Sequence, residues 1–135
     1  MLSAVTGKPM DLHGGGHSVR AFIHIEDVVK ATLKLALEGE PGSTWHLSSQ
    51  ESCTIRELVV KICKICGADF NQLVNTADER LGKDQSYLLD STAMRQIHGW
   101  TDEIKIDEGL RGTLEWVNAN IDKLRTLPWS YQHKT

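Results

Sequence analysis

The residues of this sequence that could bind a phosphate group are three consecutive glycines, Gly14–Gly16, and two arginines, Arg20 and Arg80. Glycine lets the backbone adopt positive φ and come close to a ligand, and an arginine guanidinium can hold a phosphate through two parallel hydrogen bonds. A phosphate-binding loop normally leads into a helix, whose first N–H groups contact the anion. Here an apolar, β-branched segment follows the glycines, so we predict a hairpin-type turn rather than an anion site.

The two arginines have two interpretations each. Arg20 opens an apolar segment typical of a strand, where it is either a solvated residue of an edge strand or one arm of a phosphate clamp. Arg80 lies in the irregular polar segment Asp78–Asp84 and by itself would be a solvated loop charge. The two would form a pyrophosphate site only if the fold brought them together, which their spacing leaves open.

Other residues give weaker indications of chemistry. Cys63 and Cys66 have C-x-x-C spacing, but both fall in a predicted helix with no second Cys or His pair, so we predict packing and no metal site. Asp27 is expected to cap a helix. The sequence contains no G-x-S-x-G, G-x-G-x-x-G or G-x-x-x-x-G-K-[ST] motif. We therefore expect no catalytic residue in this chain.

The elements that must position these residues alternate between short strands and helices. A helix is expected to end at Gly7, and the capping box of Thr54 and Glu57 predicts a helix that ends at Gly67. Further helices are expected at 26–38, 91–98 (capped by Asp90) and 107–124 (capped by Asp107), and strands at 10–13, 19–25, 43–49, 73–76 and 86–90. The fold class is α/β, an α+β-like small domain without room for a complete doubly wound sheet.

Composition limits the possible functions. The chain has 135 residues, a net charge of −3 and 40% hydrophobic residues, which indicates one globular domain, 1–135. The acidic balance argues against a nucleic-acid partner. No apolar run approaches the roughly 20 residues of a membrane helix and no signal peptide is visible, so we expect no membrane partner and a cytoplasmic location. Three cysteines fit a reducing compartment.

Four motifs, taken in order, resemble a known family. They are GKPMDLHGGGHSVRAFIHIEDVVKA (7–31), WHLSSQESCTIRELVVKI (45–62), ERLGKDQSYLLDSTAMRQIHGW (79–100) and IKIDEGLRGTLEWV (104–117). Together they resemble the extended short-chain dehydrogenase/reductases that act on nucleotide-diphosphate sugars, in particular the NAD-dependent 4,6-dehydratases and 4-epimerases. The resemblance covers almost the whole chain.

The resemblance implies that the chain is the C-terminal, sugar-nucleotide-binding portion of such an enzyme, without the Rossmann core. The family's Tyr-x-x-x-Lys pair and its Gly-rich NAD(P) loop would lie upstream. The expected partners are then a nucleotide-diphosphate sugar and the missing Rossmann half. The full-length enzyme would bind NAD(P), whereas this chain alone would bind no cofactor and be inactive.

The resemblance also implies roles for single residues. Arg20 and Arg80 would contact the diphosphate, and Asp84 would meet the ribose or brace an arginine. The base pocket would be lined by Met10, Leu12 and His13.

The sequence departs from the family pattern at some positions. Ala21 replaces an acid beside Arg20, and Lys83 stands in the glycine-containing run after Arg80, where it would add a positive charge near the phosphates or face solvent. Two alternatives remain: a non-catalytic nucleotide-binding or interaction module, and a domain that only folds and self-associates.

Overall fold

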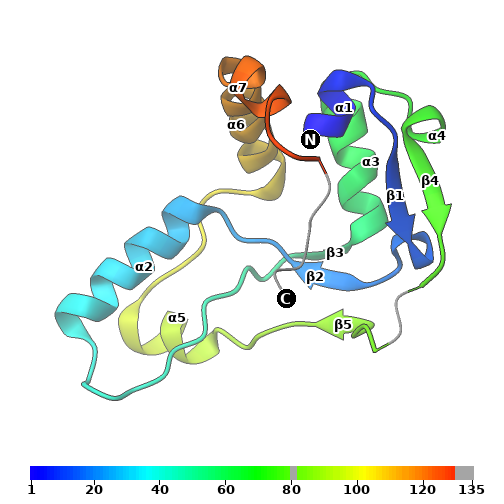
Figure 1. Cartoon of the computed structure of the whole chain (residues 1–135). Helices are drawn as coiled ribbons and strands as arrows, with labels where there is room; N and C mark the ends of the chain where they lie inside the picture. The colour runs from blue at the N-terminus through cyan, green and yellow to red at the C-terminus, as the bar shows by residue number, and fades with distance from the viewer. Residues whose placement is uncertain (80–81, 130–135) are drawn as a thin grey trace.

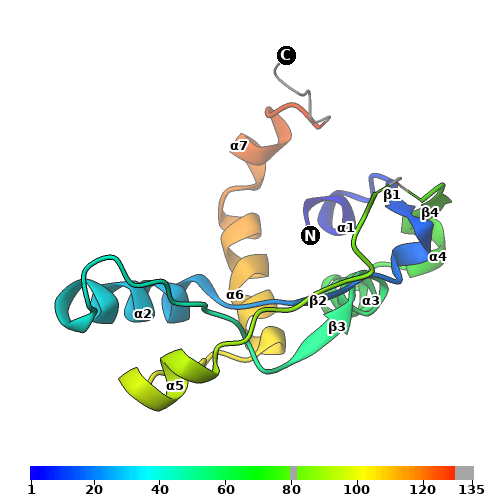
Figure 2. The same cartoon turned by 90° about the horizontal axis from the view of Figure 1, so that it is seen from below.

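The computed structural model describes residues 1–79 and 82–129 of the chain. Its helices and two small sheets form two parts joined at the middle of the molecule (Figure 1). One part is built on α3 and the other on α2, and the two parts lie on opposite sides of α6 when the molecule is seen from below (Figure 2).

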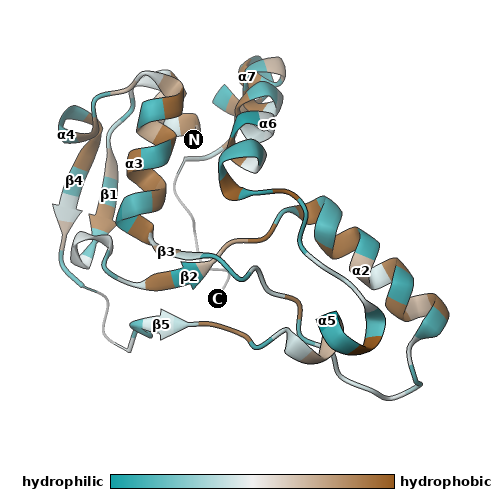
Figure 3. Ribbon diagram, turned by 180° about the vertical axis from the view of Figure 1, so that it is seen from behind, coloured by the Kyte–Doolittle hydropathy of each residue, from teal (hydrophilic) through white to brown (hydrophobic). Residues whose placement is uncertain are grey.

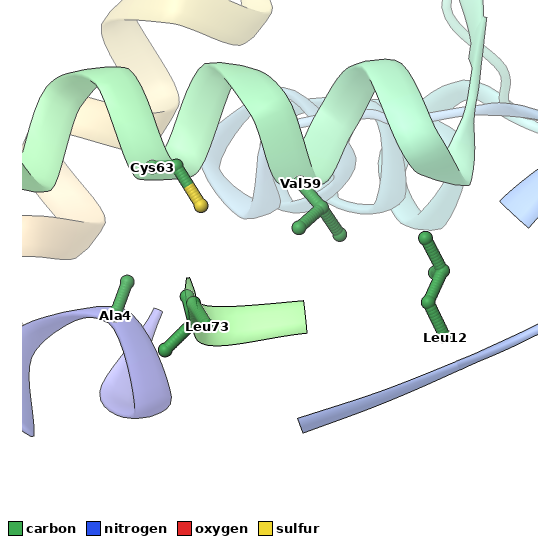
Figure 4. Close-up of a cluster of buried hydrophobic side chains, with 5 residues drawn as sticks. All are labelled: Ala4, Leu12, Val59, Cys63 and Leu73. Carbon is green, nitrogen blue, oxygen red and sulfur yellow. The ribbon is translucent and has the colours of Figure 1, made fainter. Parts of the chain in front are cut away.

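The first part contains α1 (Leu2–Thr6), β1 (Met10–His13), α3 (Ile55–Cys66), α4 (Phe70–Leu73) and β4 (Val74–Ala77). Strands β1 and β4 are parallel, with Met10 opposite Val74 and His13 opposite Ala77. Side chains of α3 point toward α1, β1 and α4 and close a core of five residues (Figure 4). These are Ala4, Leu12, Val59, Cys63 and Leu73. Burying each large aliphatic side chain stabilises the fold by about 1.5–3 kcal/mol.

Helix α3 confirms its predicted boundaries. The Thr54 hydroxyl accepts from the Glu57 N–H at 3.1 Å, and the Glu57 carboxylate accepts from the Thr54 N–H at 2.8 Å, which completes the capping box. Gly67 ends the helix in the left-handed conformation with φ of 67°. Helix α1 likewise ends at Gly7, as predicted.

The second sheet has the order β3 (Ser52–Thr54), β2 (Val19–Ala21), β5 (Ser86–Tyr87). Strand β2 is its central strand, antiparallel to β3 and parallel to β5, so the interpretation of Arg20 as an edge-strand residue is wrong. The strands predicted at 19–25 and 86–90 are both shorter, because Ile25 already opens α2 and pairing with β2 ends at Tyr87.

The second part contains α2 (Ile25–Glu38) and α5 (Thr92–His98), packed around Ala31, Met94 and Trp100. Polar contacts tie this small core to the connection that follows α5. The Asp27 carboxylate accepts from the Ile104 N–H at 3.0 Å, and its main-chain oxygen accepts from the Trp100 indole at 3.1 Å.

The predicted cap at Asp27 is therefore wrong. The residue is fully buried in the first turn of α2, and His24 is the N-cap, with its ring nitrogen accepting from the Glu26 N–H. The cap predicted at Asp90 is one residue early, because Ser91 is the N-cap of α5; the Asp90 carboxylate still accepts from the Thr92 N–H at 2.8 Å.

The remaining predictions are corrected in two places. Residues 43–49 form no strand, because no strand of the described residues pairs with them. The long helix predicted from 107 to 124 is two helices, α6 (Ile106–Ala119) and α7 (Ile121–Arg125), which meet at Asn120. The N-cap of α6 is Lys105, and Asp107 lies in its first turn, where it pairs with Lys61 at 2.7 Å.

Candidate functional site

A cavity beside β1 brings together the residues predicted to line a base pocket. It has a volume of about 530 Å³, which lies within the usual range for small-molecule sites. Its lining comes from β1, the start of α3 and the loop before β5: Met10, Asp11, Leu12, His13, Ile55, Gly82 and Lys83. The three predicted residues on β1 thus share one cavity wall.

The three residues differ in how they contribute. Leu12 is 4% exposed and belongs to the core of the first part, and Met10 packs against the same core. They therefore fix the position of β1 as well as line the cavity. His13 is half-buried, and its Nδ1 lies 3.0 Å from the main-chain oxygen of Asp78, so it ties the end of β1 to the segment after β4.

The glycine turn lies between β1 and β2. Gly14, Gly15 and Gly16 have φ of 57°, 66° and 75°, a conformation that strongly favours glycine. A turn was predicted here and is confirmed, but it is not a hairpin, because β1 and β2 belong to different sheets. The turn also packs closely: a Cβ on Gly16 would lie 2.9 Å from the Arg56 main-chain nitrogen.

Arg20 holds the loop that contributes Gly82 and Lys83 to the cavity lining. Its Nη2 donates to the main-chain oxygen of Asp84 at 2.9 Å, and its Nη1 donates to that of Val19 at 2.7 Å. Both bonds go to main-chain oxygens, and the guanidinium carries further N–H donors that a phosphate could accept. Asp84 therefore accepts a hydrogen bond from Arg20 through its main-chain carbonyl group, and Asp84 is exposed to solvent.

Arg80 lies outside the described residues, so its predicted convergence with Arg20 stays a prediction. The structure instead brings a different cation into the cavity wall. The side chain of Lys83 is 23% exposed, and its Nζ lies 3.2 Å from Oε1 of Glu79. The sequence left two alternatives for Lys83, a positive charge near the phosphates or a side chain that only faces solvent, and the second is wrong.

Sequence reasoning missed three of the cavity residues, Asp11, Ile55 and Gly82. Asp11 alternates with Met10 and Leu12 on a predicted strand, and Ile55 was assigned to the helix core alone. The signal that could have found Ile55 is its position directly after the cap Thr54, at the end of α3 that faces the glycine turn.

A second, larger groove lies between α3 and α6 and does not contain the predicted residues. Its volume is about 590 Å³, and its lining includes Lys61, Lys64, Asp107 and Arg111. A hydrogen bond from Lys61, with further help from neighbouring cations, lowers the pKa of Asp107. These charges already compensate one another on an exposed surface, so we assign the candidate site to the cavity beside β1.

The cysteines and acidic side chains add no metal site to this picture. Within residues 1–79 and 82–129, no group of three His, Cys, Asp or Glu side chains could hold a metal ion. Cys63 is buried and Cys66 half-buried, and burial raises the pKa of both thiols. In the same part of the chain, no helix is long and apolar enough to cross a membrane.

Comparison with known proteins gives relatives of one kind. The chain is 30% identical over 120 residues to a trifunctional UDP-glucose 4,6-dehydratase/UDP-4-keto-6-deoxy-D-glucose 3,5-epimerase/UDP-4-keto-L-rhamnose-reductase of Arabidopsis thaliana, covering 89% of this chain and 18% of the plant protein. It is 28% identical over 130 residues to the dTDP-glucose 4,6-dehydratase of Neisseria gonorrhoeae, covering 89% of this chain and 38% of that one. No protein-family model matches the chain.

Solved structures give the same result for the fold. The dTDP-glucose 4,6-dehydratase of Streptomyces venezuelae, solved with NAD bound, superposes with a TM-score of 0.84 at 26% identity, over 90% of this chain and 37% of that one. The UDP-glucose 4-epimerase of Thermotoga maritima, solved with UDP-glucose, superposes with a TM-score of 0.81 at 25% identity, over 89% of this chain and 38% of that one.

These likenesses confirm the resemblance and the fold class predicted from the motifs. In sequence and fold the chain is similar to part of the nucleotide-sugar dehydratases and epimerases. It spans less than two-fifths of the length of each of these four relatives.

Proposed function

We propose that the chain is the substrate-binding part of an NAD(P)-dependent nucleotide-sugar 4,6-dehydratase or 4-epimerase, and that the cavity beside β1 holds the nucleoside diphosphate. The observation that carries this proposal is the cavity shared by Met10, Leu12 and His13, whose lining also includes Gly82 and Lys83 of a loop that Arg20 binds. The relatives that act on UDP- or dTDP-sugars support the same class of ligand.

The cavity residues divide the work of binding between them. Apolar groups of Met10, Leu12 and Ile55 offer a surface on which a base can lie. Arg20 is not part of the lining, but it binds the loop next to the cavity and would offer a cationic donor to the diphosphate from there. The nucleotide is remote from the sugar carbon that reacts, so binding energy gained here would hold the sugar in its reactive position.

The glycine turn does not fit a dinucleotide-binding loop. A dinucleotide loop requires glycines that open a helix, whereas the glycine turn leads into β2, and the Glu79 carboxylate lies against Gly14. The sequence also lacks a Tyr-x-x-x-Lys pair. We therefore assign the cofactor and the catalytic groups to another part of the enzyme and derive no chemical step within this chain.

We further propose that the cofactor-binding domain of this enzyme packs against α2. Four apolar residues spaced one turn apart are exposed on this helix by 58–76%: Ile25, Val29, Leu33 and Leu37. Beside α2, the unpaired segment 43–49 packs Trp45 and Leu47 against the core of the second part. An apolar helix face next to an unpaired extended segment suits a domain that contains a sheet.

Calorimetric titration of this chain with dTDP, UDP, CDP and GDP tests the nucleotide site. We expect one diphosphate to bind and Arg20→Ala or Arg80→Ala to weaken it by about 1.5–3 kcal/mol, the scale for hydrogen bonds to charged groups. Arg111→Ala, on α6 and outside the cavity, is the matched control. Failure of all four nucleotides to bind at millimolar concentration would overturn the proposal.

Hydrogen exchange tests the interface. Backbone amides of α2 should exchange more slowly in the full-length gene product than in this chain alone, because the added domain would cover the helix. Equal exchange rates of α2 in the two proteins would overturn the proposed interface and leave the nucleotide proposal standing.

A further inference from the structure

We infer that Lys83 is a further diphosphate-contacting residue of the proposed nucleotide site, and that Glu79 neutralises it until the diphosphate takes the place of the carboxylate. This inference rests on the proposed function, because it assigns a role within the same cavity.

Lys83 lies in the wall of the proposed nucleotide site. The residue lines the cavity together with β1, and its side chain is 23% exposed although it lies in a loop. It directly precedes Asp84, whose main-chain oxygen is bound by Arg20. The hydrogen bond from Arg20 thus holds the backbone next to Lys83.

Glu79 lies beside Lys83 and the glycine turn. One carboxylate oxygen lies 3.2 Å from the Lys83 ammonium. The other occupies the space over Gly14, because a Cβ on that glycine would collide with Oε2 of Glu79. The carboxylate therefore sits between the glycine turn and the cavity wall, next to the cation that an incoming phosphate would need.

Competition between the two anions follows from these positions. A diphosphate that approaches Lys83 meets the negative charge of Glu79 at short range, and the lysine has three donors to offer to either anion. The Glu79 side chain is 50% exposed, so water can solvate its carboxylate when it turns away from Lys83. Removing the lysine charge should then weaken binding, whereas removing the glutamate charge should strengthen it.

The test is calorimetric titration of this chain, Lys83→Gln and Glu79→Gln with the nucleoside diphosphate that binds the unaltered chain, and with inorganic pyrophosphate. We expect Lys83→Gln to lower the affinity for both ligands about tenfold. Glu79→Gln should raise the affinity for both about two- to fivefold. The affinity of Lys83→Gln should also depend less on salt concentration, since one screened charge pair is missing.

A second Lys–Glu pair with the same spacing provides the matched control. Lys34 and Glu38 lie four residues apart on α2, with their charged atoms 2.9 Å apart, far from the cavity in sequence and outside its lining. Lys34→Gln and Glu38→Gln should leave both affinities unchanged. Circular dichroism spectra of all four variants check that the fold is retained.

The outcomes separate this inference from the proposed function. If the unaltered chain binds a nucleoside diphosphate and Lys83→Gln binds it equally well, the role of Lys83 is overturned and the nucleotide site stands. If Lys83→Gln weakens the nucleotide but not pyrophosphate, the lysine contacts the nucleoside, which overturns its role at the diphosphate. A Glu79→Gln variant that binds more weakly overturns the competition. If the unaltered chain binds neither ligand, both proposals fail together.

Discussion

Helices α3 and α2 are both amphipathic, but they differ in how much of their apolar surface is buried. Helix α3 buries Val59 and Cys63 against α1, β1 and α4, whereas α2 buries only Asp27 and Ala31 and exposes a second apolar face (Figure 3). A sequence with helical apolar spacing therefore predicts that a helix forms but not how much of its apolar surface this chain covers.

The two parts also differ in what holds them together. The core around α3 is a cluster of aliphatic side chains and one thiol. The core around α2 is small, and polar contacts reinforce it: Arg95 donates to Asp102 at 2.6 Å and to the Ser48 carbonyl at 2.8 Å, and Asp27 binds the Ile104 N–H. We expect hydrophobic truncation to damage the first part most and loss of charge to damage the second.

The largest expected effect is that of Leu73→Ala. Leu73 is 4% exposed in the α3 core, and its truncation leaves a cavity that should lower the free energy of unfolding by about 2–5 kcal/mol. Leu33→Ala, at a site 60% exposed on α2, should change it by less than about 0.5 kcal/mol. Urea denaturation followed by circular dichroism measures both. Equal losses in the two variants would show that the α2 face is covered in solution.

Asp102→Asn should have the next largest effect. The Asp102 side chain is 6% exposed, and the substitution removes the charge that Arg95 binds, which should cost about 1.5–3 kcal/mol. Hydrogen exchange should quicken at α5 and leave α3 unchanged. The exposed Asp122→Asn on α7 is the control, and an Asp102→Asn effect spread evenly over both parts would contradict the proposed division.

Thr54→Ala tests the start of helix α3. The substitution removes one half of the capping box and should lower the free energy of unfolding by about 1 kcal/mol, less than the loss of a core leucine. Hydrogen bonds from the Thr54 main chain and side chain lower the pKa of Glu57, so that pKa should rise in the variant. Side-chain NMR titration would detect it, and an unchanged pKa would contradict the coupling.

The smallest of these effects is the loss of stability in the α2 part when its carboxylate Asp102 is protonated in acid. Burial alone raises the pKa of Asp102, but hydrogen bonds from Arg95 and Ser49 outweigh it, and the pKa lies below its ordinary value. The ionised carboxylate therefore stabilises the fold above the unfolded-state pKa of about 3.9, and this contribution is lost as the pH falls below it. Stability measured from pH 6 to 2.5 (approximately the range of carboxylate titration) should fall less steeply in Asp102→Asn. If the stability of both proteins fell equally steeply with decreasing pH, Asp102 would not contribute to the loss of stability in acid.

The sequence predicted best where local signals were complete. Helix α3 has a capping box, an apolar stripe and a terminal glycine, and its bounds are as predicted. Strand β1 was also placed correctly, and β4 lies one residue later than expected. Predictions failed where the surrounding structure decides whether a segment forms a strand. Strand β2 is shorter than predicted because α2 begins at Ile25, and residues 43–49 pair with no strand among the described residues.

The site was predictable only in part. The motifs singled out Met10, Leu12 and His13, and the fold places them on one cavity wall. Asp84 was predicted to meet the ribose or brace an arginine, and Lys83 to add a positive charge near the phosphates or face solvent. Which atoms make their contacts could not be predicted, since that depends on how the loop folds toward Arg20 and the cavity. A carbonyl bond to Arg20 and a pair with Glu79 are properties of the folded loop.

The parallel pairing of β1 with β4 has a consequence for how the chain is made. Met10 pairs with Val74, and Val19 pairs with Ser86, so both sheets join segments that leave the ribosome at very different times. Closing such long loops is slow and costs chain entropy before contacts compensate for it. The β1 residues that line the cavity are therefore synthesised early, and the cavity is complete only after Gly82 and Lys83 have been synthesised and folded beside them. If the proposed nucleotide site is correct, a nucleotide binds only chains that have completed this late step.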